Sequence, residues 1–426
     1  MPLLRSSRLA SWSSLSTKAT TVGALAALAL VVRLLALLAV GHFHLAADPA
    51  DYDHHARSIA AGHGYPSSPV APGPTARRPP AFPYLLGAVY RLTGSSVTAG
   101  RVAQAAIGSI AVLFVALIAY ELWGRRVAIV AGAFAAFLPP LVVDGLTLLS
   151  EPLFVAFELA AVFAILRWRR HARWPWLCAA GVLAGLAILT RSNGALLLLP
   201  LLVAARPRRP WRDLHSYRAP LALLACTVVT VAPWTVRNAI VMHRFVPVSD
   251  QAGTLAGTYN AYSRAHGGIW VLANLDPAYA RLYQRERPRG EVTLDAEFRA
   301  AALRFAEHHP SYVVSAAARN TLRLFNLGGL PYERGIVAGD YGLGARWAYV
   351  LVYGLLPFLV LAVAGAATAG ARAAPRWFWA IPVLMLSTIL VLATNRFRAP
   401  IDPFIAMLAA LGAVALFDRL RRPRPS

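Results

Sequence analysis

About ten long apolar segments constrain this chain more than any other feature of its sequence. A helix needs about 17 to 25 apolar residues to cross the roughly 30 Å hydrocarbon core of a bilayer. Runs of that length lie near residues 21–40, 96–120, 127–143, 149–166, 219–235, 347–369, 377–393 and 401–417. A further stretch, 174–205, is broken by TRSNG at 190–194, and we expect two short helices that meet there in a tight turn. The sequence therefore predicts an all-α polytopic membrane protein with about ten transmembrane helices.

The composition agrees with this class of protein. The chain has 426 residues, of which 58% are hydrophobic and 14% charged, whereas roughly a quarter of the residues in a soluble domain are charged. Only one of its 42 basic residues, Lys18, is a lysine, and such an Arg-rich composition is typical of a GC-rich bacterial genome. The two cysteines, Cys178 and Cys226, lie inside apolar runs, so they indicate neither a disulfide framework nor a metal cluster.

The basic residues predict how the helices are oriented. With a cytoplasmic N-terminus, the cytoplasmic segments are residues 1–20, 121–126, 167–173, 206–218, 370–376 and 418–426. These segments carry twenty Lys or Arg against three acids, Glu121, Asp213 and Asp418, as the positive-inside rule requires. They account for most of the formal net charge of +23, so the charge gives no reason to expect nucleic acid as a partner. We therefore expect a bacterial plasma-membrane protein with both termini cytoplasmic and an uncleaved first span.

This topology divides the chain into five parts. They are a basic tail (1–20), seven spans (21–235), an outer-face helical segment (236–346), three spans (347–417) and a second basic tail (418–426). The first outer loop, 41–95, is expected to hold interfacial helices. In the outer segment, an apolar stripe at helical spacing is formed by Leu294, Phe298, Ala301, Ala302 and Phe305. Long loops in such a protein tend to carry function.

The stretch LAADPADYDHHARSIAAGHGY at 45–65 places several charges directly after the first span. Asp48, Pro49 and Asp51 have the spacing of an N-cap, a first helical position and an N3 acid in a capping box. An apolar stripe of Tyr52, Ala56, Ile59 and Ala60 follows, and Gly62 and Gly64 are expected to end the helix. One interpretation is an interfacial helix with an acidic cap. The other is a carboxylate that acts at the outer surface as a general base. The spacing alone fits both.

The order of several motifs resembles a known family. Asp48 is followed by Tyr52, Ala56 and a glycine, and then by RRPPAFPYLLGAVYRLTG at 77–94. Further stretches occur in order: LLSEPLF (148–154), GLAILTRSNGALLLLP (185–200), APWTVRN (232–238) and NRFRAPIDPF (395–404). Together they resemble the GT-C superfamily, which consists of polytopic glycosyltransferases that use polyprenyl-phosphate sugars, such as protein O-mannosyltransferases and lipid A aminoarabinose transferases.

The resemblance assigns a catalytic carboxylate to this loop. By its spacing to Tyr52, the family's catalytic acid corresponds to Asp48. In many members the next residue is also acidic, whereas here it is Pro49 and the nearest second acid is Asp51. Both acids therefore stay candidates for the base. Tyr52 and Arg78 of the same loop are candidate substrate-binding residues.

The remaining candidates lie at the outer ends of spans. Glu151 begins the fourth span, and Glu158 lies two turns later on the same face, where an ion pair with Arg33 is the alternative to a functional role. Four arginines are predicted to bind the leaving phosphate through their guanidinium groups: Arg191, Arg237, Arg396 and Arg398. The alternative for these arginines is contact with lipid headgroups.

His54 and His55 follow Asp51 at helical spacing. A divalent metal could bind there, and the alternative is that both histidines simply face solvent; no metal ligand is assigned. The resemblance implies a glycosyltransferase of hexosyl or mannosyl type that moves a sugar from a polyprenyl-phosphate donor, in the bilayer, to a hydroxyl acceptor on the outer face. The acceptor would be a protein, a glycolipid or a cell-wall glycan in the cell envelope, and the transfer would be inverting. Two other classes stay open: a lipid-linked sugar transporter or flippase, and a lipid-linked polysaccharide ligase or polymerase.

Overall fold

The computed structural model describes residues 3–206, 213–392 and 394–421, with side chains from residue 20 onward. Parts of the predicted cytoplasmic segments 1–20, 206–218 and 418–426 lie outside these residues. In the described chain the regular elements are helices, apart from one isolated antiparallel bridge between Ser67 and Pro74. The prediction of an all-α fold is confirmed for the described residues.

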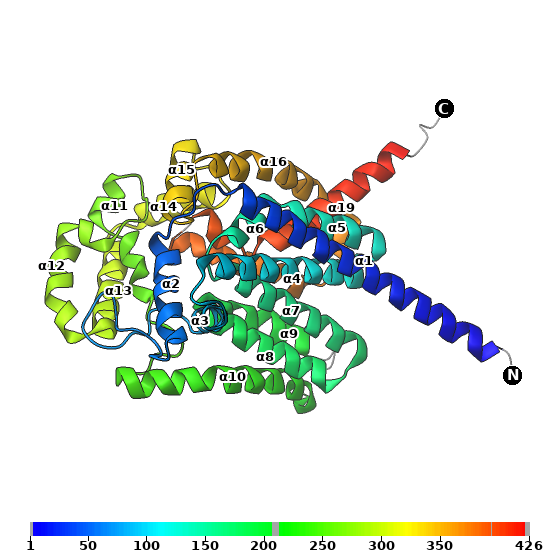
Figure 1. Ribbon diagram of the computed structural model, residues 1–426, viewed down its shortest axis with the longest axis horizontal. Helices are drawn as coiled ribbons and strands as arrows, with labels where there is room; N and C mark the ends of the chain where they lie inside the picture. Colours follow the sequence, from blue (N-terminus) through cyan, green and yellow to red (C-terminus); the bar gives the residue numbers. More distant parts are fainter. Residues whose placement is uncertain (1–2, 207–212, 393, 422–426) are drawn as a thin grey trace.

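A bundle of apolar helices forms the main body of the molecule (Figure 1). Its helices are α1 (Leu3–Ala39), α4 (Val97–Trp123), α5 (Arg125–Phe137), α6 (Pro139–Val143), α7 (Glu151–His171), α8 (Trp174–Thr190), α9 (Leu198–Ala205), α10 (Arg218–Met242), α16 (Arg346–Ala366), α17 (Ala369–Ala373), α18 (Arg376–Met385) and α19 (Asp402–Arg421). One hydrophobic core joins most of them, with Phe154, Phe378 and Phe404 fully buried at its centre. On α10, by contrast, Val229 and Ile240 are largely exposed, as expected for a helix that faces lipid.

The predicted number of about ten spans is not confirmed. Each predicted run contains a helix or a helix pair, but five helices are long and apolar enough to cross a membrane, or six if α5 and α6, which meet at 57°, form one broken span. The stretches α8, η2–α9 and α18–η7 are apolar but shorter. Helix α7 is long enough, but it carries Glu151 and Glu158 on its buried side. Length and apolar content alone therefore do not establish ten crossings.

The outer segments gather at one end of the bundle. Helices α2 (Ala47–Ala60) and α3 (Ala81–Thr93) come from the first outer loop. The segment 236–346 forms α11 (Ala261–Ala265), α12 (Pro277–Glu286), α13 (Glu291–His308), α14 (Pro310–Leu324) and α15 (Leu330–Gly339). Figure 1 shows α11 to α14 beside α2 at the left-hand end, whereas α1 begins at the opposite end. The predicted helix at Leu294–Phe305 is α13, whose apolar side packs around Tyr259, Tyr279 and Tyr312.

Helix α2 begins differently from the prediction. Its N-cap is Ala46, which is extended, and no side chain caps the helix. Asp48 lies inside the first turn, so the predicted N-cap and capping box at Asp48 and Asp51 are wrong. The apolar stripe is confirmed, because Tyr52 and Ala56 are buried and the Tyr52 ring meets Phe82 of α3 edge-on, with the ring centroids 4.8 Å apart. Both carboxylates are therefore free of capping and available to other groups.

The stretch TRSNG forms the predicted tight turn. Helix α8 ends at Thr190, and a 3₁₀ turn, Ser192–Leu197, leads into α9. Gly194 packs directly on the end of α8, where an added Cβ would lie 2.9 Å from the backbone nitrogen of Ile188. Only glycine fits this contact, and the turn fixes the position of Arg191, which stands between the two helices.

Candidate active site

Asp48 lies between two arginines that come from distant parts of the chain. Its Oδ1 accepts a hydrogen bond from Nη2 of Arg78, and its Oδ2 accepts one of 2.5 Å from Nη2 of Arg396. Asp48 is in the first turn of α2, Arg78 precedes α3, and Arg396 belongs to a 3₁₀ turn, Asn395–Arg398, just before α19. One carboxylate thus connects the first outer loop with the turn before the last helix.

Arg78 also binds the second acid of the loop. Its Nε lies 2.5 Å from Oδ2 of Asp51, and its guanidinium lies over the ring of Tyr52, 4.8 Å from the centroid. Nδ1 of His55 is 3.4 Å from the other oxygen of Asp51. Arg78 is buried, so its charge is balanced by the two carboxylates rather than by water.

Glu151 extends the cluster toward the bundle. It begins α7, and its Oε1 lies 2.6 Å from Nη1 of Arg191 and 4.0 Å from Nε of Arg396. Ser150 links this pair to α2, because its hydroxyl accepts hydrogen bonds of 3.1 Å from Tyr52 and from Arg191. The structure therefore brings together seven of the nine predicted site residues: Asp48, Asp51, Tyr52, Arg78, Glu151, Arg191 and Arg396.

A further acid, Asp340, was missed by the sequence analysis. It follows α15, and its Oδ2 lies 3.4 Å from Nε of Arg396. Phe397 was also missed, although the guanidinium groups of Arg191 and Arg396 both lie over its ring, 5.0 and 4.9 Å from the centroid. Asp340 belongs to no recognised motif, so its acidic character within a long outer segment was its only signal. We call these nine residues, together with Ser150, the carboxylate–arginine cluster.

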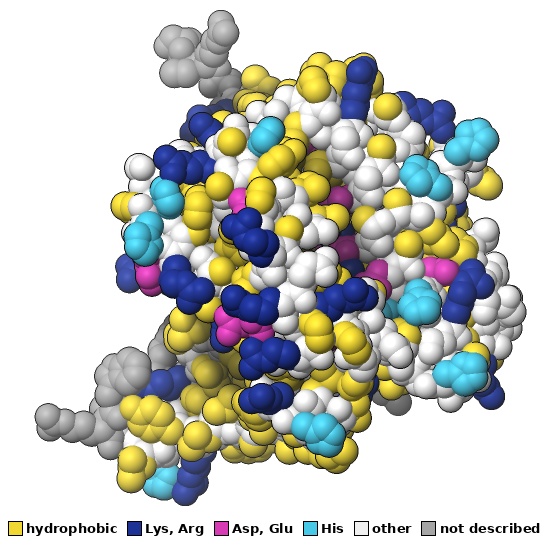
Figure 2. Space-filling model, turned by 90° about the vertical axis from the view of Figure 1, so that its left-hand side faces the viewer, with side chains coloured by type: hydrophobic (Ala, Val, Ile, Leu, Met, Phe, Trp, Pro, Cys, Tyr) yellow, Lys and Arg dark blue, Asp and Glu magenta, His cyan; other side chains and the backbone are white. Residues whose placement is uncertain are grey.

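Three acids of the cluster, Asp48, Asp51 and Asp340, reach the surface, whereas Arg78 and Arg396 lie deeper and Glu151 is buried. The side chains of Asp48 and Asp340 are 24% and 25% exposed, whereas those of Arg78 and Arg396 are 8% exposed. Figure 2 shows the end of the molecule that carries the outer segments, with acidic side chains set back in a hollow near its centre. A ligand that enters from this side meets Asp48 and Asp340 first, with Arg78 and Arg396 behind them.

The arginines set the charge state of Asp48. Burial alone would raise the pKa of this carboxyl, but the charges and hydrogen bonds of Arg396 and Arg78 outweigh burial and hold the pKa below its ordinary range. The pKa of Asp51 is lowered as well, because His55 and Arg78 outweigh the effect of burial. Burial raises the pKa of Asp340, and Arg396 opposes this only in part. Asp48 is therefore fully ionised and weakly basic while both arginines contact it.

The turn that carries Arg396 is fixed by its neighbour Asn395. The side-chain amide of Asn395 donates a 2.8 Å hydrogen bond to Oε2 of Glu333, and its Oδ1 accepts one of 3.0 Å from Tyr341. Glu333 and Tyr341 are both buried, and burial raises the pKa of Glu333 to about 7. These contacts hold Arg396 against α15 and the first turn of α2.

Two predicted arginines lie outside the cluster. Arg237 donates a 2.8 Å hydrogen bond from Nη1 to the carbonyl of Thr75 and stacks on Trp234, with 4.7 Å between its guanidinium and the ring centroid. Arg398 is fully buried, where its Nε lies 2.6 Å from Asp402 and its Nη1 donates to Asn326. The described structure therefore gives both arginines protein partners and does not place them with the other candidates.

We expect Arg398→Ala to lower the free energy of unfolding by about 3 to 5 kcal/mol, because it leaves Asp402 buried without its partner. Thermal unfolding of the purified protein measures this effect. The double variant Arg398→Met, Asp402→Leu should recover much of the stability, since no buried charge remains. If Arg398→Ala instead keeps its stability and loses affinity for polyprenyl phosphate, the arginine belongs to the ligand site.

Glu158 does not join the cluster, and His55 contacts it only through Asp51. Glu158 is fully buried, and its carboxylate has no hydrogen-bond partner among the described residues, while Arg33 donates to the carbonyls of Ala29 and Leu141. The predicted pair of Glu158 with Arg33 therefore does not form. His55 turns back to the carbonyl of Asp51, at 2.8 Å from Nδ1. Among the described residues, no group of three or more His, Cys, Asp or Glu has the arrangement of a metal site.

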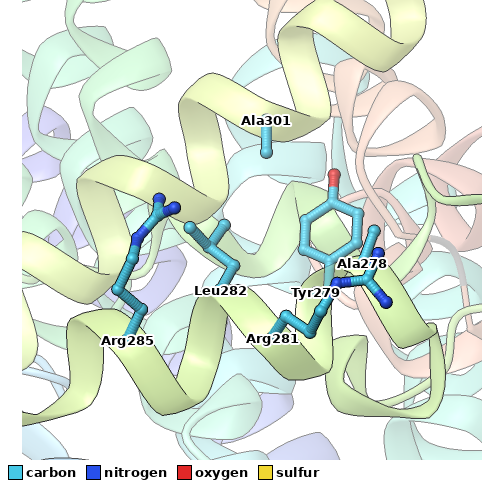
Figure 3. Close-up of a pocket in the computed structure, with 6 residues that line it drawn as sticks. All are labelled: Ala278, Tyr279, Arg281, Leu282, Arg285 and Ala301. Atoms are coloured by element: carbon cyan, nitrogen blue, oxygen red, sulfur yellow. The ribbon is translucent and has the colours of Figure 1, made fainter.

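A separate depression lies between α12 and α13 (Figure 3). It is lined by Ala278, Tyr279, Arg281, Leu282, Arg285 and Ala301, with Leu282 and Tyr279 pointing toward α13. None of these residues belongs to the carboxylate–arginine cluster. Arg285 is already paired, because its Nε lies 2.6 Å from Glu286. The depression therefore adds nothing to the candidate active site.

The chain is similar to known glycosyltransferases. Residues 77–236 match the family model described as dolichyl-phosphate-mannose-protein mannosyltransferase. The archaeal oligosaccharyltransferase AglB from Archaeoglobus fulgidus, in complex with an inhibitory peptide and a dolichol-phosphate, has a TM-score of 0.57 and 14% identity over 97% of this chain and 53% of its own. The apo form of the Archaeoglobus fulgidus oligosaccharyltransferase has a TM-score of 0.52 and 14% identity over 96% and 53%. This chain thus spans about half the length of those proteins.

ArnT from Cupriavidus metallidurans, bound to undecaprenyl phosphate, aligns over 92% of this chain and 77% of its own, with 17% identity and a TM-score of 0.43. No curated protein matches the chain. The family match over residues 77–236 contains Arg78, Glu151 and Arg191 of the cluster. Together with the shared fold, this match agrees with the resemblance that the motifs indicated: residues 77–236 are similar to the dolichyl-phosphate-mannose-protein mannosyltransferases, and the fold of the chain is similar to that of the AglB oligosaccharyltransferase.

Proposed function

We propose that the protein moves a sugar from a polyprenyl-phosphate donor to a hydroxyl acceptor, with inversion at the anomeric carbon. The observation that carries this proposal is Asp48 held between Arg78 and Arg396. Such a transfer needs a base that takes the proton of the acceptor hydroxyl and cations that stabilise the departing phosphate. The carboxylate–arginine cluster supplies both kinds of group within one hydrogen-bonded unit.

The donor itself would make Asp48 a better base. In the protein without donor, the two arginines bind Asp48 and depress its pKa. The donor phosphate is a diester that shares one negative charge between two oxygens, and these fit the paired N–H donors of a guanidinium group, so Arg78 and Arg396 would turn from the carboxylate to the phosphate. Asp48 then loses its positive neighbours, and its pKa rises toward the value of a buried carboxyl. The base is therefore activated when the donor is bound.

The chemical step follows from this arrangement. One oxygen of Asp48 accepts the proton of the acceptor hydroxyl while the acceptor oxygen bonds to the anomeric carbon. The bond between that carbon and the phosphate oxygen breaks on the opposite face, and polyprenyl phosphate leaves with its new charge bound by Arg78 and Arg396. Arg191, paired with Glu151, contacts the same Phe397 ring as Arg396 and would neutralise the further phosphate charge. Asp51 keeps Arg78 in position.

We place this site on the outer face of a bacterial plasma membrane, with about ten helical crossings and both termini cytoplasmic. The positive-inside distribution of Lys and Arg supports this orientation. The position of α2 and the outer segment opposite the start of α1 agrees with it (Figure 1). The match to the mannosyltransferase family and the dolichol-phosphate bound to AglB support a polyprenyl-phosphate donor. The acceptor would be a protein, a glycolipid or a wall glycan.

A panel of donors in membranes tests this function. Membranes that contain the protein should transfer radiolabel from at least one monosaccharide linked to polyprenyl monophosphate, with mannose as the first sugar to test. Membranes that contain Asp48→Asn provide the background. Transfer from a diphosphate-linked oligosaccharide alone would indicate a ligase or polymerase. Movement of a labelled donor between leaflets without cleavage would indicate a flippase.

A further inference from the structure

The loop that delivers Arg78 is tied to the outer segment. We call residues 65–80, between α2 and α3, the strap. It folds back on itself where the amide of Ser68 donates a 2.8 Å hydrogen bond to the carbonyl of Gly73, whose φ of +100° favours glycine. The strap then passes over the first residue of α13 before it reaches Arg78. The position of a cluster arginine thus depends on this contact.

We propose that Glu291 is a positioning residue that holds the strap, and with it Arg78, in the geometry of the site. The carboxylate of Glu291 accepts hydrogen bonds from three groups of the strap. They are the hydroxyl of Thr75 at 2.9 and 3.0 Å, the amide of Ala76 at 2.9 Å and the hydroxyl of Ser68. Glu291 and Thr75 are buried, so these bonds are protected from water. The role in catalysis rests on the proposed function, whereas the contact itself does not.

Neighbouring bonds fix the two ends of the strap in the same way. Arg237 donates to the carbonyl of Thr75 at 2.8 Å, and the hydroxyl of Tyr65 lies 3.2 Å from the carbonyl of Arg78. On the outer segment, Tyr283 of α12 donates a 3.1 Å hydrogen bond to the carbonyl of Val70. Arg237 therefore belongs to the support of the site rather than to its phosphate contacts. Among the side chains that the structure describes, that of Glu291 binds both arms of the turn, Ser68 on one and Thr75 and Ala76 on the other.

A second carboxyl, Asp250, makes this anchor sensitive to protons. Its amide donates a 3.3 Å hydrogen bond to the carbonyl of Ala76, and its side chain lies next to Glu291. Both carboxylate oxygens of Asp250 are buried and have no donor among the described residues. Two carboxylates can share a hydrogen bond only when one carries a proton. Burial, with the charge of Glu291, accordingly raises the pKa of Asp250 to about 8.

The surrounding charged groups do not cancel the raised pKa of Asp250. The other charged groups near the pair are Asp295 and Arg299 of α13, Arg77 of the strap and Arg237 of α10. Burial raises the pKa of Asp295 to about 6, even though the amide of Gly253 donates to it. No arginine is among the main causes of the raised pKa of Asp250. The closed strap therefore binds one proton that the open strap, with an aspartate of ordinary pKa, releases.

The direction of the pH dependence follows from this difference. The state that binds more protons is favoured as the pH falls, so closure of the strap is strongest in acid. Between the ordinary pKa of aspartate, about 4, and the raised value of about 8 for Asp250, each rise in pH favours opening. With one proton involved, the limit is about tenfold per pH unit. Above that range the equilibrium between the closed and the open strap no longer changes with pH.

Hydrogen exchange of the strap amides in the full-length protein tests the proposal without reference to activity. At pH 6, Glu291→Ala should exchange these amides about tenfold faster than wild type or more, the usual effect of losing hydrogen bonds to a charged group. Glu307→Ala, an exposed acid on the same helix, is the matched control and should leave exchange unchanged. In wild type, the exchange rate of the strap amides, divided by the intrinsic exchange rate of an unprotected amide at the same pH, should rise between pH 5 and pH 8. In Asp250→Asn this rise should disappear.

The activity readout separates this proposal from the proposed function. In Glu291→Ala, a mobile Arg78 should raise the KM for donor more than it lowers kcat. Asp48→Asn should leave strap exchange unchanged. If Glu291→Ala exchanges its strap like wild type, or if Asp250→Asn keeps the pH dependence, the anchoring role is wrong. If the exchange results hold but the wild type transfers no sugar from any polyprenyl monophosphate, the anchor stands and the proposed function fails.

Discussion

Asp48→Asn is expected to lower sugar transfer by about 10²- to 10⁴-fold, the contribution usual for a positioned general base. Asparagine has the same shape but cannot accept a proton at neutral pH. Arg78 keeps Asp51 as a partner and Arg396 keeps Asp340, so the variant should fold and express normally. Its affinity for polyprenyl phosphate should equal or exceed that of wild type, because the carboxylate no longer competes for the arginines. Single-turnover transfer and equilibrium binding measure the two effects.

Asp51→Asn is the matched control for this experiment. Asp51 contacts Arg78 and His55 but not Arg396, and we expect a smaller loss of transfer with weaker donor binding. If Asp48→Asn stays active and Asp51→Asn does not, the base is Asp51. If both variants remain active, neither carboxylate is the base. Loss of phosphate affinity in Asp48→Asn would contradict the idea that the carboxylate and the phosphate compete.

Arg396→Ala is expected to weaken the binding of polyprenyl phosphate by about 10- to 100-fold. Hydrogen bonds to charged groups contribute about 1.5 to 3 kcal/mol, and about 1.4 kcal/mol corresponds to tenfold in affinity. Arg396→Lys keeps the charge but loses the planar pair of donors, so its affinity should lie between those of Arg396→Ala and wild type. Titration with polyprenyl phosphate in detergent or nanodiscs measures both variants.

Arg334→Ala is a suitable control for the arginine experiment. Arg334 is an exposed arginine of α15 that stacks on Tyr349 and has no contact with the cluster. Its removal should leave the affinity for polyprenyl phosphate unchanged. Equal affinities of wild type and Arg396→Ala would mean that the phosphate binds elsewhere, and the assignment of the cluster as a donor site would then be wrong.

The sequence predicts the helices of this fold well, because apolar runs and their basic flanks follow from the bilayer itself. It predicts the number of crossings less well, since α7 carries acids and α8, α9 and α18 are short. The N-cap predicted at Asp48 was wrong because it was inferred from neighbouring residues only. The Asp-Pro spacing is a local signal. The arginines that bind the Asp48 carboxylate, Arg78 and Arg396, lie 30 and 348 residues away in the sequence. Local spacing could not reveal them.

The difference between local and distant partners also explains which site residues were predicted from the sequence. Arg191 and Arg396 were identified because arginine is unusual in short outer turns, and both lie in the cluster. Arg398 showed the same signal, but a buried partner four residues later, Asp402, takes its charge. Asp340 lies in no motif, and its contact with Arg396 depends on how α15 folds back to that residue. Partners within one helix can be predicted from spacing, whereas partners across the bundle need the structure.

The most direct test of the central claim is transfer by the purified protein in liposomes. The donor is a polyprenyl monophosphate that carries a radiolabelled sugar, and both the labelled acceptor and the released polyprenyl phosphate are counted. We predict that one polyprenyl phosphate appears for each sugar transferred and that Asp48→Asn abolishes both products. If the label stays on the lipid for every monophosphate donor, or moves only from a diphosphate donor, the cluster around Asp48 is not the transfer site proposed for it.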